Sequence, residues 1–173
     1  MIDMDDVVVD AYVKAERAKI DRVKKWDNRF LDMAWFVAQW SKDPSTKTGA
    51  VITSPDNVVL SVGYNGFPKG VADTPERLND RDTKYAIIVH CERNAVLRAR
   101  ADVRGATLYT WPFGSCTVCA SLMITAGIKR VVSPACPADK LDRWGPDLIR
   151  AANLYREAGL EVIEYPPFEM LLS

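Results

Sequence analysis

Five short β-rich runs, the first two joined by a tight turn, constrain the fold more than any other feature of this chain. The first two cover residues 50–53 and 58–62, and the residues between them, Ser54-Pro55-Asp56-Asn57, favour turns. We therefore expect a hairpin. The other three runs alternate with helical stretches, and they cover 106–110, 128–132 and 162–165. This order predicts an α/β fold, a three-layer α-β-α sandwich with a mixed five-stranded sheet.

Two helices are expected ahead of the hairpin. The first covers about residues 5–25, and its loose apolar stripe suits docking on its own domain or on a sister subunit. Asp27 is a favourable N-cap residue, so a second and more apolar helix is expected from there to Trp40. The sequence therefore predicts an appended N-terminal helix over residues 1–25 and a single domain over residues 26–173.

The remaining helices are expected between the later strands. Gly127 and Gly159 end two of them, and Pro146 suits the first turn of the last. The polar segment 71–82 is expected to be irregular. The predicted helical ranges are 91–100, 117–126 and 146–158.

Composition and charge exclude several classes of protein. Lys plus Arg and Asp plus Glu both number 23, so the net charge is zero, which argues against a nucleic-acid partner. No apolar run approaches the roughly 20 residues that a membrane helix needs, and the acidic start MIDMDDVVVD lacks the basic region of a signal peptide. We therefore expect a cytoplasmic protein with no membrane partner. Its four cysteines should be reduced thiols or metal ligands.

Two short motifs gather the residues that carry chemistry. They are His90-Cys91-Glu92 and Cys116-Thr117-Val118-Cys119, each at the expected start of a helix. One histidine and two thiolates are good zinc ligands, and a catalytic zinc has three protein ligands and one open position. The positive ends of two helices would stabilise thiolates and a bound hydroxide. His90, Cys116 and Cys119 are therefore the candidate ligands of a Zn²⁺ ion.

Glu92 distinguishes a hydrolytic site from a structural one. A structural zinc site has no use for a carboxylate beside its ligands, whereas a hydrolytic site needs one to take a proton from water. Glu92 is therefore the candidate catalytic residue. Three alternatives stay open from the spacing alone. They are a structural zinc site completed by Cys91 or Cys136, a thioredoxin-like Cys-x-x-Cys redox motif, and four unrelated buried thiols.

The wider sequence resembles a known family. His-x-Glu followed by a downstream Cys-x-x-Cys, each opening a helix on a mixed sheet, is typical of the zinc-dependent nucleobase deaminases. From Trp26 to Glu164 the chain is more specifically similar to the deoxycytidylate (dCMP) deaminases. The stretches that carry this likeness are WSKDPSTKTGAVI (40–52), VGYNGFPKGVADTPERL (62–78), DTKYAIIVHCERNAVL (82–97), GATLYT (105–110) and CxxC-ASLMITAGIKRVV (116–132).

The resemblance implies a cytidine deaminase-like fold and hydrolytic deamination of dCMP to dUMP and ammonia, which supplies dUMP for thymidylate synthesis. It implies that a zinc-bound hydroxide attacks the pyrimidine while Glu92 shuttles the protons. It also implies that Asn65 holds the sugar and orients the base, and that the backbone N–H of Cys91 binds the pyrimidine carbonyl. Lys42 and Lys84 are expected near the 5′-phosphate. The resemblance also implies a homo-oligomer, a hexamer in this family. It further implies allosteric regulation by dCTP with Mg²⁺.

The chain departs from the family pattern in two places. Cys91 stands where a small alanine is usual between the histidine and the glutamate, and Ser115 stands where proline is usual before the first cysteine. The second departure alters the loop above the base. Two alternative functions stay open. One is a deaminase of another substrate, such as a modified dCMP, dCTP, a nucleic acid or a riboflavin precursor, and the other is a non-catalytic zinc-stabilised module.

Overall fold

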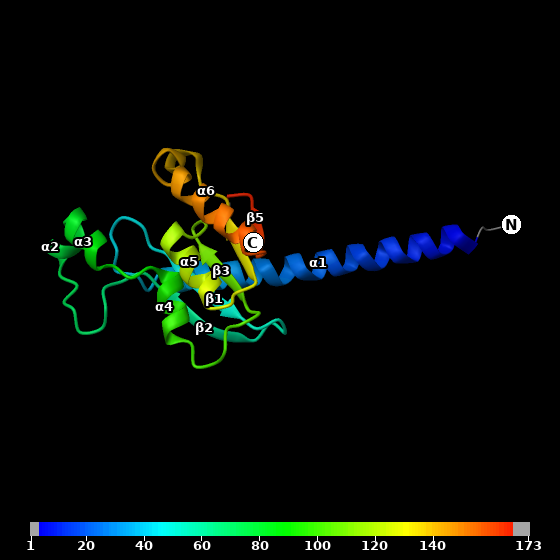
Figure 1. Cartoon of the computed structure of the whole chain (residues 1–173), viewed down its shortest axis with the longest axis horizontal. Helices are drawn as coiled ribbons and strands as arrows, with labels where there is room; N and C mark the ends of the chain where they lie inside the picture. The colour runs from blue at the N-terminus through cyan, green and yellow to red at the C-terminus, as the bar shows by residue number, and fades with distance from the viewer. Residues whose placement is uncertain (1–3, 168–173) are drawn as a thin grey trace.

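A computed structural model describes residues 4–167, with side chains from residue 20 onward, and contains one mixed sheet with the strand order β2-β1-β3-β4-β5 (Figure 1). β1 pairs antiparallel with both β2 and β3, whereas β4 and β5 continue the sheet in parallel. The predicted mixed five-stranded sheet is therefore confirmed. The strands are β1 (Gly49–Thr53), β2 (Val59–Tyr64), β3 (Thr107–Trp111), β4 (Arg130–Pro134) and β5 (Glu161–Tyr165).

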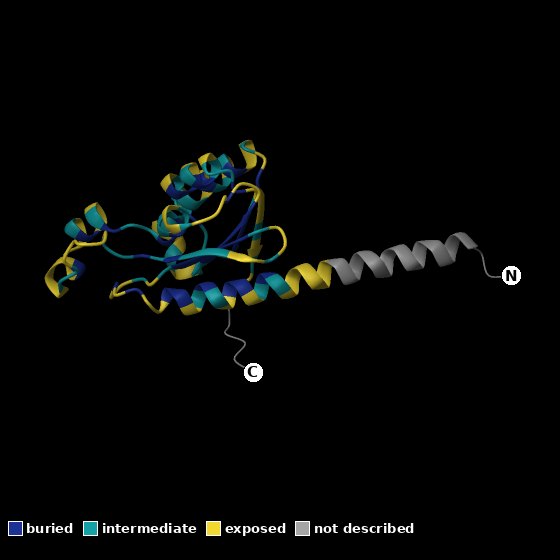
Figure 2. Cartoon of the chain, turned by 90° about the horizontal axis from the view of Figure 1, so that it is seen from below, coloured by how far each residue is buried: buried dark blue, intermediate teal, exposed yellow. Residues whose placement is uncertain are grey.

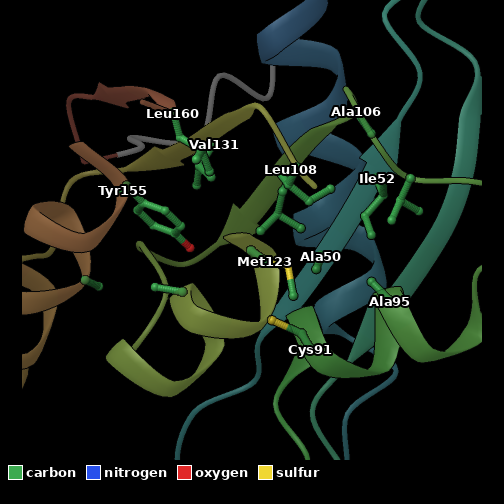
Figure 3. Close-up of a cluster of buried hydrophobic side chains, with 14 residues drawn as sticks. Ala50, Ile52, Cys91, Ala95, Ala106, Leu108, Met123, Val131, Tyr155 and Leu160 are labelled. Carbon is green, nitrogen blue, oxygen red and sulfur yellow. The ribbon is translucent and has the colours of Figure 1, made fainter. Parts of the chain in front are cut away.

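Helices cover both faces of the sheet. Successive side chains of a strand point to opposite faces. Accordingly, Val51 packs with Phe30 and other residues of α1 (Met4–Ala38), whereas Ala50 and Ile52 pack with residues of α4 (Cys91–Arg98). Figure 3 shows this second cluster, which α5 (Thr117–Thr125) and α6 (Leu141–Glu157) complete. The predicted three-layer α-β-α arrangement is therefore confirmed.

The two helices predicted at the N-terminus are one continuous helix. α1 runs from Met4 to Ala38, so the prediction that Asp27 begins a second helix is wrong. Asp27 instead lies within α1, where its buried carboxylate binds Arg130 of β4. A charged partner across the sheet outweighs the local preference of aspartate for a helix start. Within the part of the chain whose placement is described, no helix is long and apolar enough to cross a membrane.

The proposed boundary between residues 25 and 26 coincides with a change in burial. Residues 20–25 of α1 are exposed, and from Trp26 onward the helix alternates between buried and exposed side chains (Figure 2). Of the apolar stripe noted in the sequence, Ile20 and Val23 are exposed. Val9 and Val13 lie outside the residues whose side chains are described. The division into an appended helix (1–25) and a domain (26–173) stays a prediction.

Two further expectations about helices are wrong. The segment 71–82 was expected to be irregular, but it contains α2 (Pro75–Asn79) and the start of α3 (Arg81–Ile87). Side-chain oxygens of Thr74 and Asp80 cap these two short helices. α6 begins at Leu141, after the short 3₁₀ helix η1 (Ala138–Lys140), so Pro146 lies inside the helix rather than in its first turn.

Gly63 brings α4 directly against β2. A Cβ atom at this position would collide with the carbonyl oxygen of Cys91 and the amide nitrogen of Ala95. Only glycine permits this approach. The contact holds the start of α4 at the edge of the sheet where β2 and β3 end. Loops that leave the carboxyl ends of strands commonly form ligand sites, so this edge is where a site is expected.

Candidate metal centre and cleft

A cleft opens at this edge of the sheet. Its walls come from the loop 43–48, from α3, from the start of α4, from the loop 111–116 and from the start of α6. His90, Glu92 and Cys116 all line it, so the two chemical motifs share one cavity.

The three predicted metal ligands converge beside this cleft. His90 and Cys116 are the N-cap residues of α4 and α5, and Cys119 lies in the first turn of α5. The sulfur atoms of Cys116 and Cys119 both lie 3.4 Å from Nδ1 of His90. The three ligand atoms all lie within 4.8 Å of one another.

This geometry fits a tetrahedral zinc ion. Zn–S bonds of about 2.3 Å and Zn–N bonds of about 2.0–2.1 Å at tetrahedral angles place sulfur and nitrogen about 3.6 Å apart. Within residues 20–167, no other group of three such ligands converges. Cys91 donates its thiol to Glu92, and Cys136 contacts the carbonyl oxygen of Pro137. Neither cysteine joins the group, which therefore offers three protein ligands among residues 20–167.

Hydrogen bonds within the group prepare it for a metal. The hydrogen bond from the Cys119 thiol, assisted by one from His90, lowers the pKa of Cys116 to about 4. The same contact with Cys116, together with burial, raises the pKa of Cys119. The hydrogen bond with Cys116 also raises the pKa of His90. The surroundings of Cys116 therefore favour its thiolate form, which is the form that zinc requires.

Glu92 lines the cleft next to the metal group. It is 5% exposed and lies in the first turn of α4, where its Oε2 accepts a hydrogen bond of 3.2 Å from the Cys91 thiol. His90 has an extended backbone, with φ −67° and ψ 155°, because it precedes the helix. The helical spacing of about 100° per residue therefore does not apply between His90 and Glu92. Both side chains reach the same cleft.

Asn65 lines the cleft and organises its wall. Its side-chain amide donates to Oδ2 of Asp43 at 3.2 Å and to the carbonyl oxygen of Thr46 at 2.9 Å. Its Oδ1 accepts the N–H of Thr48 at 2.8 Å. Both amide hydrogens are thus committed to the loop 43–48. The oxygen retains one lone pair.

The two lysines predicted near a phosphate have different surroundings. Lys84 lines the cleft but is 4% exposed, and its Nζ contacts Oδ1 of Asp43 at 3.0 Å and Oγ of Ser45 at 2.8 Å. Lys42 has a side chain that is 70% exposed, pairs with Asp73 at 2.8 Å and does not line the cleft. The structure therefore brings Asn65, Cys91 and Lys84 to the cleft and leaves Lys42 outside.

Several residues of the cleft were not anticipated from the sequence. Asp147 of α6 accepts hydrogen bonds from the backbone N–H of Thr117, at 3.0 Å, and from its hydroxyl, at 2.6 Å. It thereby ties α6 to the start of α5. Arg143 and Trp144 form another part of the wall. None of these residues belongs to a short motif, so the sequence carried no local signal for them.

Comparison with known proteins identifies the family. Residues 24–134 match the family model described as the cytidine and deoxycytidylate deaminase zinc-binding region. The chain is 41% identical over 144 residues to a deaminase of Aliivibrio fischeri, a match that covers 83% of this chain and 96% of that protein. It is 42% identical over 120 residues to mouse deoxycytidylate deaminase, covering 66% of this chain and 67% of the mouse protein.

Solved structures share the fold. The dCMP deaminase of the cyanophage S-TIM5, crystallised with dCMP and dUMP, superposes with a TM-score of 0.62 at 19% identity. The match covers 80% of this chain and 95% of that one. The predicted cytidine deaminase-like fold is therefore confirmed. The chain belongs to the family of zinc-binding cytidine and deoxycytidylate deaminases. Its relatives within that family include the deoxycytidylate deaminases of mouse and human.

Proposed function

We propose that this chain catalyses the hydrolytic deamination of dCMP to dUMP and ammonia. The observation that carries the proposal is the convergence of the His90, Cys116 and Cys119 ligand atoms within 4.8 Å of one another, beside a cleft that Glu92 also lines. A structural zinc site would not need this carboxylate, whereas hydrolysis does. The similarity to deoxycytidylate deaminases supports the choice of substrate.

Glu92 moves the protons of the reaction. His90, Cys116 and Cys119 would hold a zinc ion, which would lower the pKa of a water molecule and so supply a nucleophile at neutral pH. Glu92 accepts the proton that this water loses and delivers it to N3 of the pyrimidine. Once the hydroxide oxygen is bonded to C4, Glu92 takes the proton of that hydroxyl group and transfers it to the amino group, which leaves as ammonia when the C4–N bond breaks. The hydrogen bond from the Cys91 thiol holds one carboxylate oxygen in place during both transfers.

Backbone and amide groups orient the base and the sugar. Cys91 is the first residue of α4, a position whose N–H has no acceptor within the helix. That N–H binds the pyrimidine carbonyl. The remaining lone pair of Asn65 Oδ1 accepts a sugar hydroxyl, and Lys84 fixes the loop 43–48 through Asp43 and Ser45. Lys42 is not assigned a contact with the substrate in this proposal, because its side chain is exposed and pairs with Asp73.

The family resemblance also bears on the assembly and the regulation of the protein. We further propose that the chain forms a homo-oligomer, which is a hexamer in this family. Exposed apolar side chains support this assembly. These include Phe36 and Trp40 near the end of α1 and Ile149 on α6. Regulation by dCTP with Mg²⁺ and a cytoplasmic location rest on the resemblance and on the sequence composition. The zero net charge supports a small nucleotide rather than a nucleic acid as the substrate.

Ammonia release tests the proposal directly. The zinc-loaded protein is incubated with dCMP, CMP, deoxycytidine and dCTP at equal concentration, with and without dCTP at effector level. We expect release from dCMP well above release from the other three. A protein that contains one zinc per chain and yet releases no ammonia under either condition would overturn the proposal. Preferential turnover of deoxycytidine would replace the nucleotide by the nucleoside as the substrate.

A further inference from the structure

Two buried hydroxyl groups near the metal group have no hydrogen-bond partner. Ser115 is 2% exposed and Tyr155 is 3% exposed. In the part of the chain whose placement is described, theirs are the buried side-chain oxygens that neither donate nor accept a hydrogen bond. Buried polar groups are nearly always hydrogen-bonded in proteins, because burying one without a partner costs free energy. The two hydroxyls therefore call for a partner that the metal-free protein does not supply.

The two hydroxyls lie close to each other and to the metal ligands. Ser115 directly precedes Cys116, the N-cap residue of α5. The Tyr155 side chain points from α6 toward α5 within the core cluster (Figure 3). Burial raises the pKa of Tyr155 and the Ser115 hydroxyl lowers it, while negative charge on Glu92, Cys119 and Cys116 raises it further. Such effects weaken with distance, so the Tyr155 hydroxyl faces both Ser115 and the charges of the metal group.

The two sulfur atoms of the metal group differ in their donors. Cys116 Sγ accepts the backbone N–H of Cys119 at 3.5 Å. Cys119 is 0% exposed, and among residues 20–167 the one nitrogen or oxygen in hydrogen-bond contact with its sulfur is Nδ1 of His90, at 3.4 Å. A ring nitrogen that holds a metal is no longer a donor. In the loaded protein the Cys119 thiolate would therefore be a buried negative charge without a hydrogen-bond donor.

We propose that Tyr155 and Ser115 are positioning residues of the metal centre. In the zinc-loaded protein the Tyr155 hydroxyl donates to the Cys119 thiolate, and the Ser115 hydroxyl donates to the oxygen of Tyr155. The donor without an acceptor and the acceptor without a donor thereby satisfy each other. This inference rests on the zinc site of the proposed function and not on the identity of the substrate.

The pair depends on a departure of this chain from the family pattern. Ser115 stands where proline is usual, and proline has no hydroxyl group to donate. Hydrogen bonds to metal ligands orient the ligands and tune the metal, and removing such a partner lowers metal affinity by about 10- to 100-fold. A donor on a thiolate also lowers the energy of the sulfur lone pairs. The pair should therefore affect both the affinity for zinc and the spectrum of a coloured metal in the same site.

Zinc affinity tests the inference without relying on turnover. Competition with a chelating dye measures the zinc dissociation constant of Tyr155→Phe, of Ser115→Ala and of the double variant. The controls are Tyr64→Phe and Ser121→Ala, which make the same chemical changes elsewhere. Ser121 is exposed on α5, Tyr64 belongs to β2, and neither lines the cleft.

We expect Tyr155→Phe to weaken zinc binding by about 10- to 100-fold and Ser115→Ala to weaken it by a smaller factor. Both controls should bind zinc like the wild type. Because Ser115 acts through Tyr155, Ser115→Ala should have no further effect in the Tyr155→Phe background. Wild-type zinc affinity in Tyr155→Phe would overturn the inference. A Ser115→Ala effect that persists in the double variant would overturn the serial arrangement.

Two further measurements separate positioning from a structural role. Metal-free Tyr155→Phe should unfold like the metal-free wild type, since its hydroxyl has no partner there. With Co²⁺ in place of zinc, the sulfur-to-metal charge-transfer band should move to longer wavelength in Tyr155→Phe, because the thiolate has lost its donor. An unshifted band together with lower metal-free stability would assign Tyr155 to packing alone and contradict the inference.

Glu92 is the other negative group that the Tyr155 hydroxyl faces. If Tyr155→Phe keeps the wild-type zinc affinity and Co²⁺ band but shifts the pH profile of kcat, the hydroxyl serves Glu92 and the inference is wrong. If dCMP is turned over and Tyr155→Phe binds zinc like the wild type, the inference fails and the proposed function stands. If no dCMP is turned over but Tyr155→Phe weakens zinc binding, the function fails and the inference stands.

Discussion

Asp27, in the middle of α1, and Arg130, at the start of β4, form a bidentate ion pair with N–O distances of 2.6 and 2.7 Å. Asp27 is 1% exposed, and its carboxylate also accepts the hydroxyls of Tyr109 and Tyr165. These contacts attach α1 to the centre of the sheet. The metal group and the cleft are built from α4, α5 and α6, which cover the opposite face.

We predict that Asp27→Ala destabilises the fold severely. The substitution leaves the half-buried Arg130 guanidinium with only the exposed Glu161 as a carboxylate partner and removes the acceptor of two tyrosine hydroxyls. Breaking such a pair costs about 3–5 kcal/mol of unfolding free energy. Urea denaturation measures the loss. Lys42→Ala is the control, since it removes an exposed ion pair and should leave the unfolding midpoint unchanged. A wild-type midpoint for Asp27→Ala would contradict the prediction.

Three of the six tyrosines should resist ionisation in the folded protein. Burial raises the pKa of Tyr109, Tyr155 and Tyr165 above the ordinary value of 10.0, and Asp27 raises the first and third further. Above pH 10 the unfolded chain therefore binds fewer protons than the folded one, so stability falls as pH rises. Below pH 10 these groups contribute no pH dependence.

Phenolate absorbance during an alkaline titration measures this effect. We expect Tyr109, Tyr155 and Tyr165 to ionise together with unfolding. Tyr155→Phe should reduce the number of tyrosines that ionise only on unfolding from three to two. Because the Tyr155 hydroxyl has no hydrogen-bond partner among the described residues, this variant should not lose stability. Normal titration of all six tyrosines in the folded state would contradict the prediction.

The parts of this molecule that follow from local patterns could be predicted from the sequence. The strands follow from runs of β-branched residues, and the metal group follows from two motifs whose spacing fits a helix start. Thr74 and Asp80, which cap α2 and α3, were also visible as capping residues, so these two helices were within reach of the same reasoning.

The parts that depend on distant partners could not be predicted. Asp27 is a good capping residue by local rules, and its partner Arg130 lies 103 residues away. Nothing in the sequence distinguishes Lys42 from Lys84. Only the folded chain shows that Lys84 is buried and paired with Asp43, whereas Lys42 is exposed and paired with Asp73. Arg143 follows no motif. Its guanidinium lies near the ring of its neighbour Trp144 and near that of Tyr85, which is 58 residues away, and only the folded chain shows this.

Gly63→Ala should disturb the site through the fold. The added methyl group would collide with backbone atoms of Cys91 and Ala95, so α4 must move away from β2 and carry His90 and Glu92 with it. We expect a loss of stability of about 1–3 kcal/mol and weaker zinc retention. Gly66→Ala is a matched control, because the nearest atom to its added methyl group lies 3.9 Å away. Equal stability of the two variants would contradict the prediction.

Asn65→Ala should lose stability as well as activity. The variant leaves the N–H of Thr48 and the carbonyl oxygen of Thr46 without their partner and removes a donor to Asp43. Each unsatisfied group costs about 1–3 kcal/mol. Thermal unfolding and kinetics with dCMP measure both effects. A residue that only contacted the sugar would change the KM and leave the melting temperature unchanged, and that result would contradict the role in the cleft wall.

Glu92→Gln should separate metal binding from proton transfer. The amide keeps the size of the side chain and an oxygen that can accept the Cys91 thiol, but it cannot carry a proton between water and the pyrimidine. General acid–base groups contribute about 100- to 10,000-fold to a rate, so we expect a loss of kcat in this range while one zinc per chain is retained. Atomic absorption and ammonia release measure the two quantities.

Cys119→Ala is the complementary variant, because it removes a ligand atom and should lose the zinc itself. Full turnover by Glu92→Gln would remove Glu92 from the mechanism. Stoichiometric zinc in Cys119→Ala would remove Cys119 from the ligand set, and the two results are independent because the variants alter different groups.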